Sequence, residues 1–285
     1  MPQVEHHPGV SFGAAAAAST TAPRPLPAAS GSPALRQLPL SAPFRWLLMG
    51  WRDFNECPAI GLFYGTAFMA MGWLLLSVFH HAPAYTLALS AGFLLLGPCL
   101  CLGLYQASRS LHLGETPDLG RSLLAWETRT GQLAIFGFVL LILEMLWGRA
   151  SLIVFAVSFD GMPDFKGSLT ALLNPENVEF AITYLSVAAV FGGLIYAVSA
   201  ISIPMLLDRD TDAVTAGLTS LRLVLGQPLV MLLWALLLMV LVVVAMLPWF
   251  AGLLVVAPVL GHASWHAYRE AVLPEAEEDG SADPD

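Results

Sequence analysis

The chain has 285 residues, of which 57% are hydrophobic and 12% carry a charge, and its mean hydropathy is +0.71. These values exclude an ordinary soluble globular domain and favour a membrane protein with several spans. The net charge of −9 comes largely from six acidic residues between Glu275 and Asp285. The rest of the chain is nearly neutral, which argues against a nucleic-acid-binding surface.

The N-terminal part of the chain divides into a polar tail and an amphipathic stretch. Residues 1–43 are rich in Ala, Pro, Ser and Thr and have few large apolar side chains, so we predict a disordered tail there. In residues 43–56, apolar residues recur at three- and four-residue spacing, while Arg45 and Arg52 fall elsewhere on the helical wheel. This pattern predicts a short helix in the headgroup layer, and a plain cytoplasmic extension of the first span is the alternative.

Long apolar stretches follow, and several reach the roughly 20 residues that one membrane crossing requires. The last stretch, residues 228–261, is too long for one crossing and is divided by Pro248. We therefore predict an all-α polytopic membrane domain over residues 44–271 with six transmembrane helices, and an acidic disordered tail over residues 272–285. The predicted spans are residues 59–80, 83–107, 132–158, 177–207, 228–247 and 249–268.

The basic residues indicate how these spans are oriented. With six spans, ten of the 12 Lys and Arg residues fall on one side of the membrane. Lys166 falls in an opposite loop and Arg149 lies within a span. A five-span arrangement would move Arg269 to the other side, so the charge bias favours six spans with both termini in the cytoplasm.

Two pairs of segments in the chain are similar in sequence. Residues 97–109 and 257–269 share a proline, a leucine, an aromatic residue, an alanine and a final arginine in one register. The polar stretches 116–132 and 211–227 share Thr, Leu, Gly and Gln at equal spacing. These matches favour three related helical hairpins, with each polar stretch forming a short surface helix, and chance or shared interfacial chemistry is the alternative. The matched pairs include Pro98 and Pro258, Tyr105 and Trp265, and Arg109 and Arg269.

Two charged residues, Glu144 and Arg149, lie inside the third predicted span. Charges in the hydrocarbon core are costly and usually face protein or water, so this pair is a candidate intramembrane polar site: a gate, a proton path or an anion site. Alternatively, Arg149 snorkels toward the outer headgroups beside Trp147, which leaves Glu144 protonated or paired elsewhere.

A second candidate site lies on the predicted cytoplasmic side. His262 and His266 are four residues apart and share a helix face, so they are candidate ligands of a divalent metal or a haem. The alternative is that the histidines are ordinary side chains of the membrane interface and that the Asp residues belong to a solvated helix end. The candidate ligands are His262, His266, His112, Asp208, Asp210 and Asp212.

Three segments of the sequence together resemble a known family. They are GWRDFNECPAIGLFYG (50–65), SIPMLLDRDTDAVTA (202–216) and PVLGHASWHAYRE (258–270). They resemble the bacterial integral-membrane family called domain of unknown function 2189, over about residues 45–270. The resemblance implies a six-span protein of the Gram-negative inner membrane and no established activity.

The function that we expect is non-enzymatic, because the chain has no phosphate-binding Gly loop, nucleophile elbow or HExxH motif. We predict a scaffold or accessory factor for other membrane proteins, which acts in the lipid bilayer with such partners or as a homo-oligomer. The alternatives are a haem- or metal-binding accessory of a respiratory oxidase and a carrier of small solutes or lipids.

Overall fold

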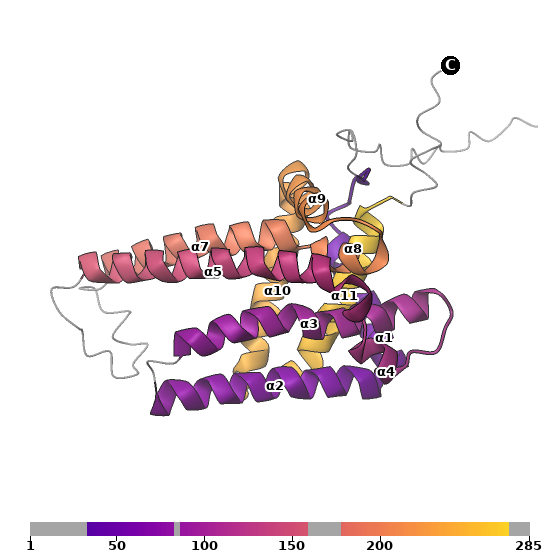
Figure 1. Ribbon diagram of the computed structural model, residues 1–285, viewed down its shortest axis with the longest axis horizontal. Helices are drawn as coiled ribbons and strands as arrows, with labels where there is room; N and C mark the ends of the chain where they lie inside the picture. The colour runs from indigo at the N-terminus through magenta and orange to yellow at the C-terminus, as the bar shows by residue number, and fades with distance from the viewer. Residues whose placement is uncertain (1–32, 83–85, 159–177, 274–285) are drawn as a thin grey trace, which may run out of the picture.

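The computed structural model of the chain describes residues 33–82, 86–158 and 178–273 (Figure 1). Within these ranges the fold is all-helical, as predicted, apart from an isolated antiparallel bridge between Leu35 and Val272. In chain order the elements are α1 (Ala42–Glu56), α2 (Pro58–His81), α3 (Thr86–His112), α4 (Leu119–Leu123), the 3-10 turn η2 (Glu127–Arg129), α5 (Thr130–Ser158), α7 (Val178–Ser199), α8 (Ser202–Asp208), α9 (Ala213–Gly226), α10 (Pro228–Met246) and α11 (Leu253–Ala271).

Four helical segments of the described chain are long and apolar enough to cross a membrane. They are α2, α5, the combined segment Val178–Asp208, and α10. These helices support an integral membrane protein with several spans. The other two predicted spans form α3, of 27 residues, and α11, of 19 residues, and each helix contains a proline, Pro98 or Pro258.

The long helices are arranged in pairs. In Figure 1, α2 runs beside α3 and α5 runs beside α7, while α10 and α11 cross behind them. Helix α11 packs against α1, α2 and α3, and two glycines allow its close approach. A Cβ atom on Gly65 would lie 2.0 Å from the Leu254 carbonyl oxygen, and one on Gly50 would lie 2.5 Å from the Val259 carbonyl oxygen.

The connection between α10 and α11 is longer than the predicted turn at Pro248–Trp249. Helix α10 ends at Met246 and α11 begins at Leu253, and Trp249 and Phe250 both have positive φ angles, of 53° and 63°. The Trp249 carbonyl accepts a 2.5 Å hydrogen bond from Trp73 Nε1. Because α2 continues from Trp73 to His81, the connection lies about 12 Å short of the end of α2.

The folded part of the chain also extends beyond the predicted bounds of 44–271. Leu35 and Leu38 are 1% and 8% exposed, and Arg36 N–H donates to the Ala271 carbonyl. The amide of Leu38 donates to Gln227 Oε1 at 2.7 Å. The predicted tail boundary at residue 43 is therefore too late, because a few apolar residues in a polar stretch find distant partners. The rest of both predicted tails lies outside the described residues.

Helices α1 and α9 enter the next helix through the same kind of joint. The joint residues, Cys57 and Gln227, have nearly identical dihedral angles: φ −133° and ψ 59° for Cys57, φ −136° and ψ 58° for Gln227. Each donates its N–H to the carbonyl four residues earlier, and each precedes a proline that starts the following helix. The predicted surface helix over 211–227 is observed as α9, whereas residues 116–132 form the short α4, η2 and the start of α5.

Candidate functional site

In Figure 1, α1, α8 and the C-terminal ends of α3 and α11 meet at one end of the molecule. Polar side chains of these helices contact one another there. Five of the arginines that the sequence assigns to one side of the membrane make contacts in this region. The residues are Arg45, Arg109, Arg129, Arg209 and Arg269. This end of the fold is built from long-range pairs between helices that are distant in sequence.

Asp208 is the most connected carboxylate of this end. Its Oδ1 accepts from Arg109 Nε at 3.2 Å, and its Oδ2 accepts from Arg269 Nη1 at 3.0 Å and from the Tyr268 hydroxyl at 2.9 Å. The Asp208 side chain is 13% exposed. One carboxylate thus connects the ends of α3, α8 and α11. Next to it, Arg209 Nε donates to the Tyr268 hydroxyl at 3.2 Å.

The other acidic candidates have separate partners. Asp210 pairs with Arg129 and is 95% exposed. Asp212 caps α9, because its Oδ1 accepts from the amides of Val214 and Thr215 at 2.9 Å each. Hydrogen bonds from the Thr215 hydroxyl and amide lower the pKa of the Asp212 carboxyl. Asp212 therefore has a structural role at the start of α9, while Asp210 forms a surface pair with η2.

His262 and His266 share a face of α11, as their spacing predicts. They contact Ser108 and Asp53, two residues that the sequence pattern did not indicate. Ser108 Oγ donates to Asp53 Oδ2 at 2.6 Å and lies 2.7 Å from His262 Nδ1. Since the hydroxyl has one proton, His262 Nδ1 donates to it. His266 Nε2 lies 2.9 Å from the same Asp53 oxygen. A chain of hydrogen bonds therefore connects α1, α3 and α11.

His262 is fully buried, and its Nε2 atom has no hydrogen-bond partner within the described residues. The third histidine, His112, lies 3.2 Å from Arg269 Nη2 through its Nε2 atom. The six candidate metal ligands are therefore distributed over several groups with different partners. Across the described ranges, no group of three or more His, Cys, Asp or Glu side chains is arranged to hold a metal ion.

Glu144 and Arg149 lie on different sides of α5. Glu144 is partly buried and Arg149 is exposed, and neither forms a hydrogen bond or an ion pair within the described part of the chain. Trp147 Nε1 and Ser151 Oγ are buried in the same helix and also lack partners among these residues. Glu144, Trp147 and Ser151 follow the three- and four-residue spacing of one helix face, and Arg149 faces elsewhere.

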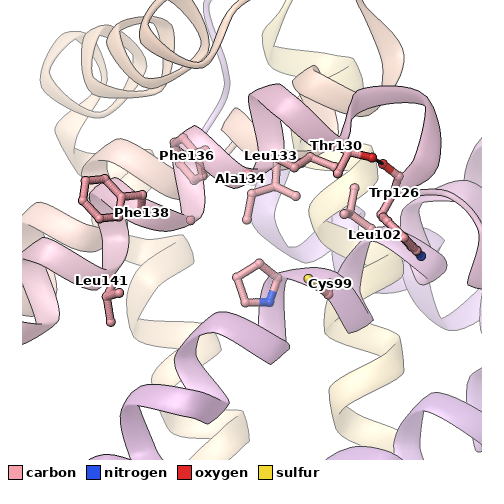
Figure 2. Close-up of a pocket in the computed structure, with 12 residues that line it drawn as sticks. Cys99, Leu102, Trp126, Thr130, Leu133, Ala134, Phe136, Phe138 and Leu141 are labelled. Atoms are coloured by element: carbon pink, nitrogen blue, oxygen red, sulfur yellow. Dashed lines mark hydrogen bonds between the residues drawn. The ribbon is translucent and has the colours of Figure 1, made fainter.

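Two apolar hollows lie between the long helices. One, of about 410 Å³, is formed mainly by α3 and α5, and Trp126 also lines it (Figure 2). Cys99 and Leu102 line it from α3, and Phe138 from α5, while Thr130 Oγ1 at one end donates to the Trp126 carbonyl at 3.0 Å. The other, of about 740 Å³, lies between α7 and α10 beside the C-terminal end of α9. Both have the size and apolar lining that suit hydrocarbon chains.

The comparison with known families confirms the resemblance found in the sequence. The model of domain of unknown function 2189, described as a predicted integral membrane protein, matches residues 85–208. The matched part runs from the start of α3 to the end of α8 and includes Arg109 and Asp208. No curated protein and no solved structure matches the chain.

Proposed function

We propose that this chain is a six-span protein of the bacterial inner membrane with both termini in the cytoplasm, and that it acts as a non-enzymatic scaffold or accessory factor for other membrane proteins. In this proposal the spans form three hairpins: α2 with α3, α5 with α7, and α10 with α11. The polar end of the fold is the cytoplasmic end, because basic residues are retained on that side.

The repeated joints support the hairpin arrangement. Helix α1 leads into α2 through Cys57, and α9 leads into α10 through Gln227, with the same backbone angles. The ends of α3 and α11 carry the matched residues Arg109 and Arg269, and both contact Asp208. The first and third hairpins therefore begin with the same kind of joint and end with a matched arginine.

The scaffold role rests on one observation: the charged groups at the polar end hold helices together. Asp208 connects α3, α8 and α11, and Asp53 connects α1 with α3 and α11. Glu270 of α11 binds Arg45 and accepts from Trp46 Nε1 at 2.8 Å, both in α1. Charges used in this way fix the relative positions of the helices, which gives the outer surface a constant shape for partners.

The outer face of α5 is the surface that we assign to partners. Phe138 and Leu152 are 62% and 60% exposed there, and Arg149 is also exposed. An arginine in a span favours an acidic or polar group on a neighbouring helix over lipid alone. We therefore expect the transmembrane helices of a partner to contact α5 near Arg149.

Photo-crosslinking in native membranes tests this proposal. A benzophenone amino acid replaces Leu152 in one variant and Leu140, which is 2% exposed, in a matched control. We expect Leu152 to yield adducts with another membrane protein and Leu140 to yield none. Adducts only with a second copy of the chain would indicate a homo-oligomer. An absence of adducts at both Leu152 and Phe138, which are exposed on α5, would contradict the scaffold role.

Reporter fusions test the six-span topology separately. Fusion of a cytoplasmically active fluorescent protein after Asp285 should give signal, and alkaline phosphatase at the same point should give none. Alkaline phosphatase inserted near Lys166 should be active, because that loop is assigned to the periplasm. Phosphatase activity at the C-terminus would indicate an odd number of spans and exclude the three-hairpin arrangement.

A further inference from the structure

Helices α1 and α9 present matching apolar stripes to the outside of the molecule. When the joint residues Cys57 and Gln227 are aligned, the stripe positions of the two helices coincide. In α1 the stripe is Phe44, Leu48 and Trp51, and in α9 the aligned residues are Val214, Leu218 and Leu221. Five of the six side chains are exposed and Leu221 is half-buried, so the two helices show similar outward faces.

The inner faces of the same helices are packed. Trp46 of α1 is fully buried and contacts Trp234 of α10 edge to face, with ring centroids 5.4 Å apart. Ala216 and Ser220 of α9 are also fully buried, and α9 packs against α7 and α8. The outward stripes are therefore a second apolar face, additional to the one that holds each helix to the bundle.

The joints place these stripes at the membrane boundary. Only one residue separates the end of α1 from the first residue of α2, and one separates α9 from α10. Both α2 and α10 are candidate membrane spans. A helix connected to a span by a single residue ends where that span enters the bilayer, so its uncovered side faces the headgroup and upper acyl region.

Basic residues accompany both stripes at equivalent positions. When Cys57 is aligned with Gln227, Arg52 of α1 corresponds to Arg222 of α9. Arg52 is exposed, whereas Arg222 is half-buried and its Nη1 atom lies inside the protein. Arg45, at the start of α1, is 48% exposed while it pairs with Glu270. An apolar stripe bordered by guanidinium groups is the pattern of helices that bind anionic lipid surfaces.

We propose that α1 and α9 are a pair of interfacial helices. Their stripes lie at the boundary between headgroups and acyl chains, and the exposed Arg52 binds the headgroups of anionic phospholipids such as phosphatidylglycerol. The assignment of these helices to the cytoplasmic leaflet rests on the orientation proposed above, whereas the lipid contact itself does not.

Spin labels on the full-length protein test the position of the stripes. Cysteine replaces Leu48 or Leu218 in a C99S/C101S background, and Asp210, which is 95% exposed, provides the control position. The protein is placed in nanodiscs of phosphatidylethanolamine and phosphatidylglycerol. We expect labels at positions 48 and 218 to collide more often with oxygen than with a water-soluble nickel chelate, and the label at position 210 to show the reverse. Nickel-dominated collisions at either stripe would overturn the proposal.

Lipid analysis tests the headgroup contact. The R52Q variant should retain less phosphatidylglycerol after detergent extraction, by about fivefold, because one arginine contact with the headgroup layer is lost. R121Q is the matched control, because Arg121 is an exposed arginine of α4 that pairs with Glu115. Equal phosphatidylglycerol retention in wild type and R52Q would exclude the headgroup contact.

These results are independent of the proposed function. Lipid-exposed stripes without partner adducts on α5 would support the interfacial helices and contradict the scaffold. Water-exposed stripes that crosslink to a protein would overturn the lipid proposal and leave the scaffold in place.

Discussion

Arg109 and Arg269 bind the two oxygens of a single carboxylate, that of Asp208, at 3.2 and 3.0 Å. These arginines occupy matching positions at the ends of α3 and α11, so the sequence echo between the two segments corresponds to convergence in space. Two cations share one anion here, and the Tyr268 hydroxyl donates to the same anion. Removal of the Asp208 charge would therefore leave both guanidinium groups without their main partner.

The first prediction concerns the stability of this arrangement. Asp208→Asn should lower the free energy of unfolding by about 2 kcal/mol, because charge-assisted hydrogen bonds to a mostly buried group are lost. The loss is modest because Arg109 and Arg269 are about one-third exposed, so that water screens part of their interaction with Asp208. The measurement is thermal unfolding in mild detergent, followed by the loss of monodisperse protein.

Asp210→Asn provides the matched control, since it makes the same chemical change two residues away. Asp210 is 95% exposed and pairs with Arg129 at the surface, so its replacement should change the free energy of unfolding by less than about 0.5 kcal/mol. Equal losses in both variants would show that net charge, and not the connection of α3, α8 and α11, determines the stability.

Much of the helical architecture could be predicted because it depends on local pattern. The spans expected at 59–80, 132–158 and 228–247 are observed as helices with ends that differ by at most two residues, since apolar length and proline at a helix start are visible in the sequence. The number of residues in the α10–α11 connection was not predictable. Trp249 in this connection contacts Trp73 of α2, and no local sequence pattern indicates that long-range contact.

The site was less predictable because its contacts are long-range. The spacing of His262 and His266 correctly predicts a shared helix face. Nothing in the spacing indicates that Asp53, more than 200 residues earlier in the chain, lies 2.9 Å from His266. Asp53 lies on the α1 face that packs inward. An acidic residue at such a position is the sequence feature that could have indicated a buried polar contact. The same limit explains the ordered segment at residues 33–41, which is held by the distant Gln227.

The second prediction concerns that segment. Gln227 accepts from the Leu38 amide at 2.7 Å and donates to the Arg36 carbonyl at 2.8 Å, so Gln227→Ala should release the chain around Arg36. Limited digestion with trypsin should then cut after Arg36 faster than in the wild type, while the body of the protein stays folded. Gln132→Ala is the control, since Gln132 binds the amide of Ala213 and does not contact the segment. Unchanged cleavage at Arg36 in Gln227→Ala would contradict the assigned role.

The third prediction concerns the contact between α2 and α11. Gly65→Ala places a Cβ atom 2.0 Å from the Leu254 carbonyl oxygen, and backbone atoms cannot move aside without displacing α11. We expect a loss of about 1–3 kcal/mol in the free energy of unfolding. Gly192→Ala adds the same methyl group in α7, where no atom lies within 4 Å, and should change the stability by less than about 0.5 kcal/mol. Chemical denaturation in detergent micelles compares the two variants, and equal stability would argue against close packing at Gly65.

The last prediction concerns the thiol at the joint between α1 and α2. Burial raises the pKa of Cys57 to about 11, and the negative charges of Asp53 and Glu56 contribute in the same direction. Because the thiolate is the reactive form, only about one thiol in a thousand is reactive at pH 8. In the C99S/C101S background, alkylation of the folded protein should be slow and should accelerate about tenfold for each pH unit between 8 and 10. The same protein unfolded in detergent should react quickly and level off above an ordinary thiol pKa of about 8.5. A folded-state rate that levels off at that lower pH would show that the joint opens to solvent and that Cys57 is not held in the packed contact between α1 and α2.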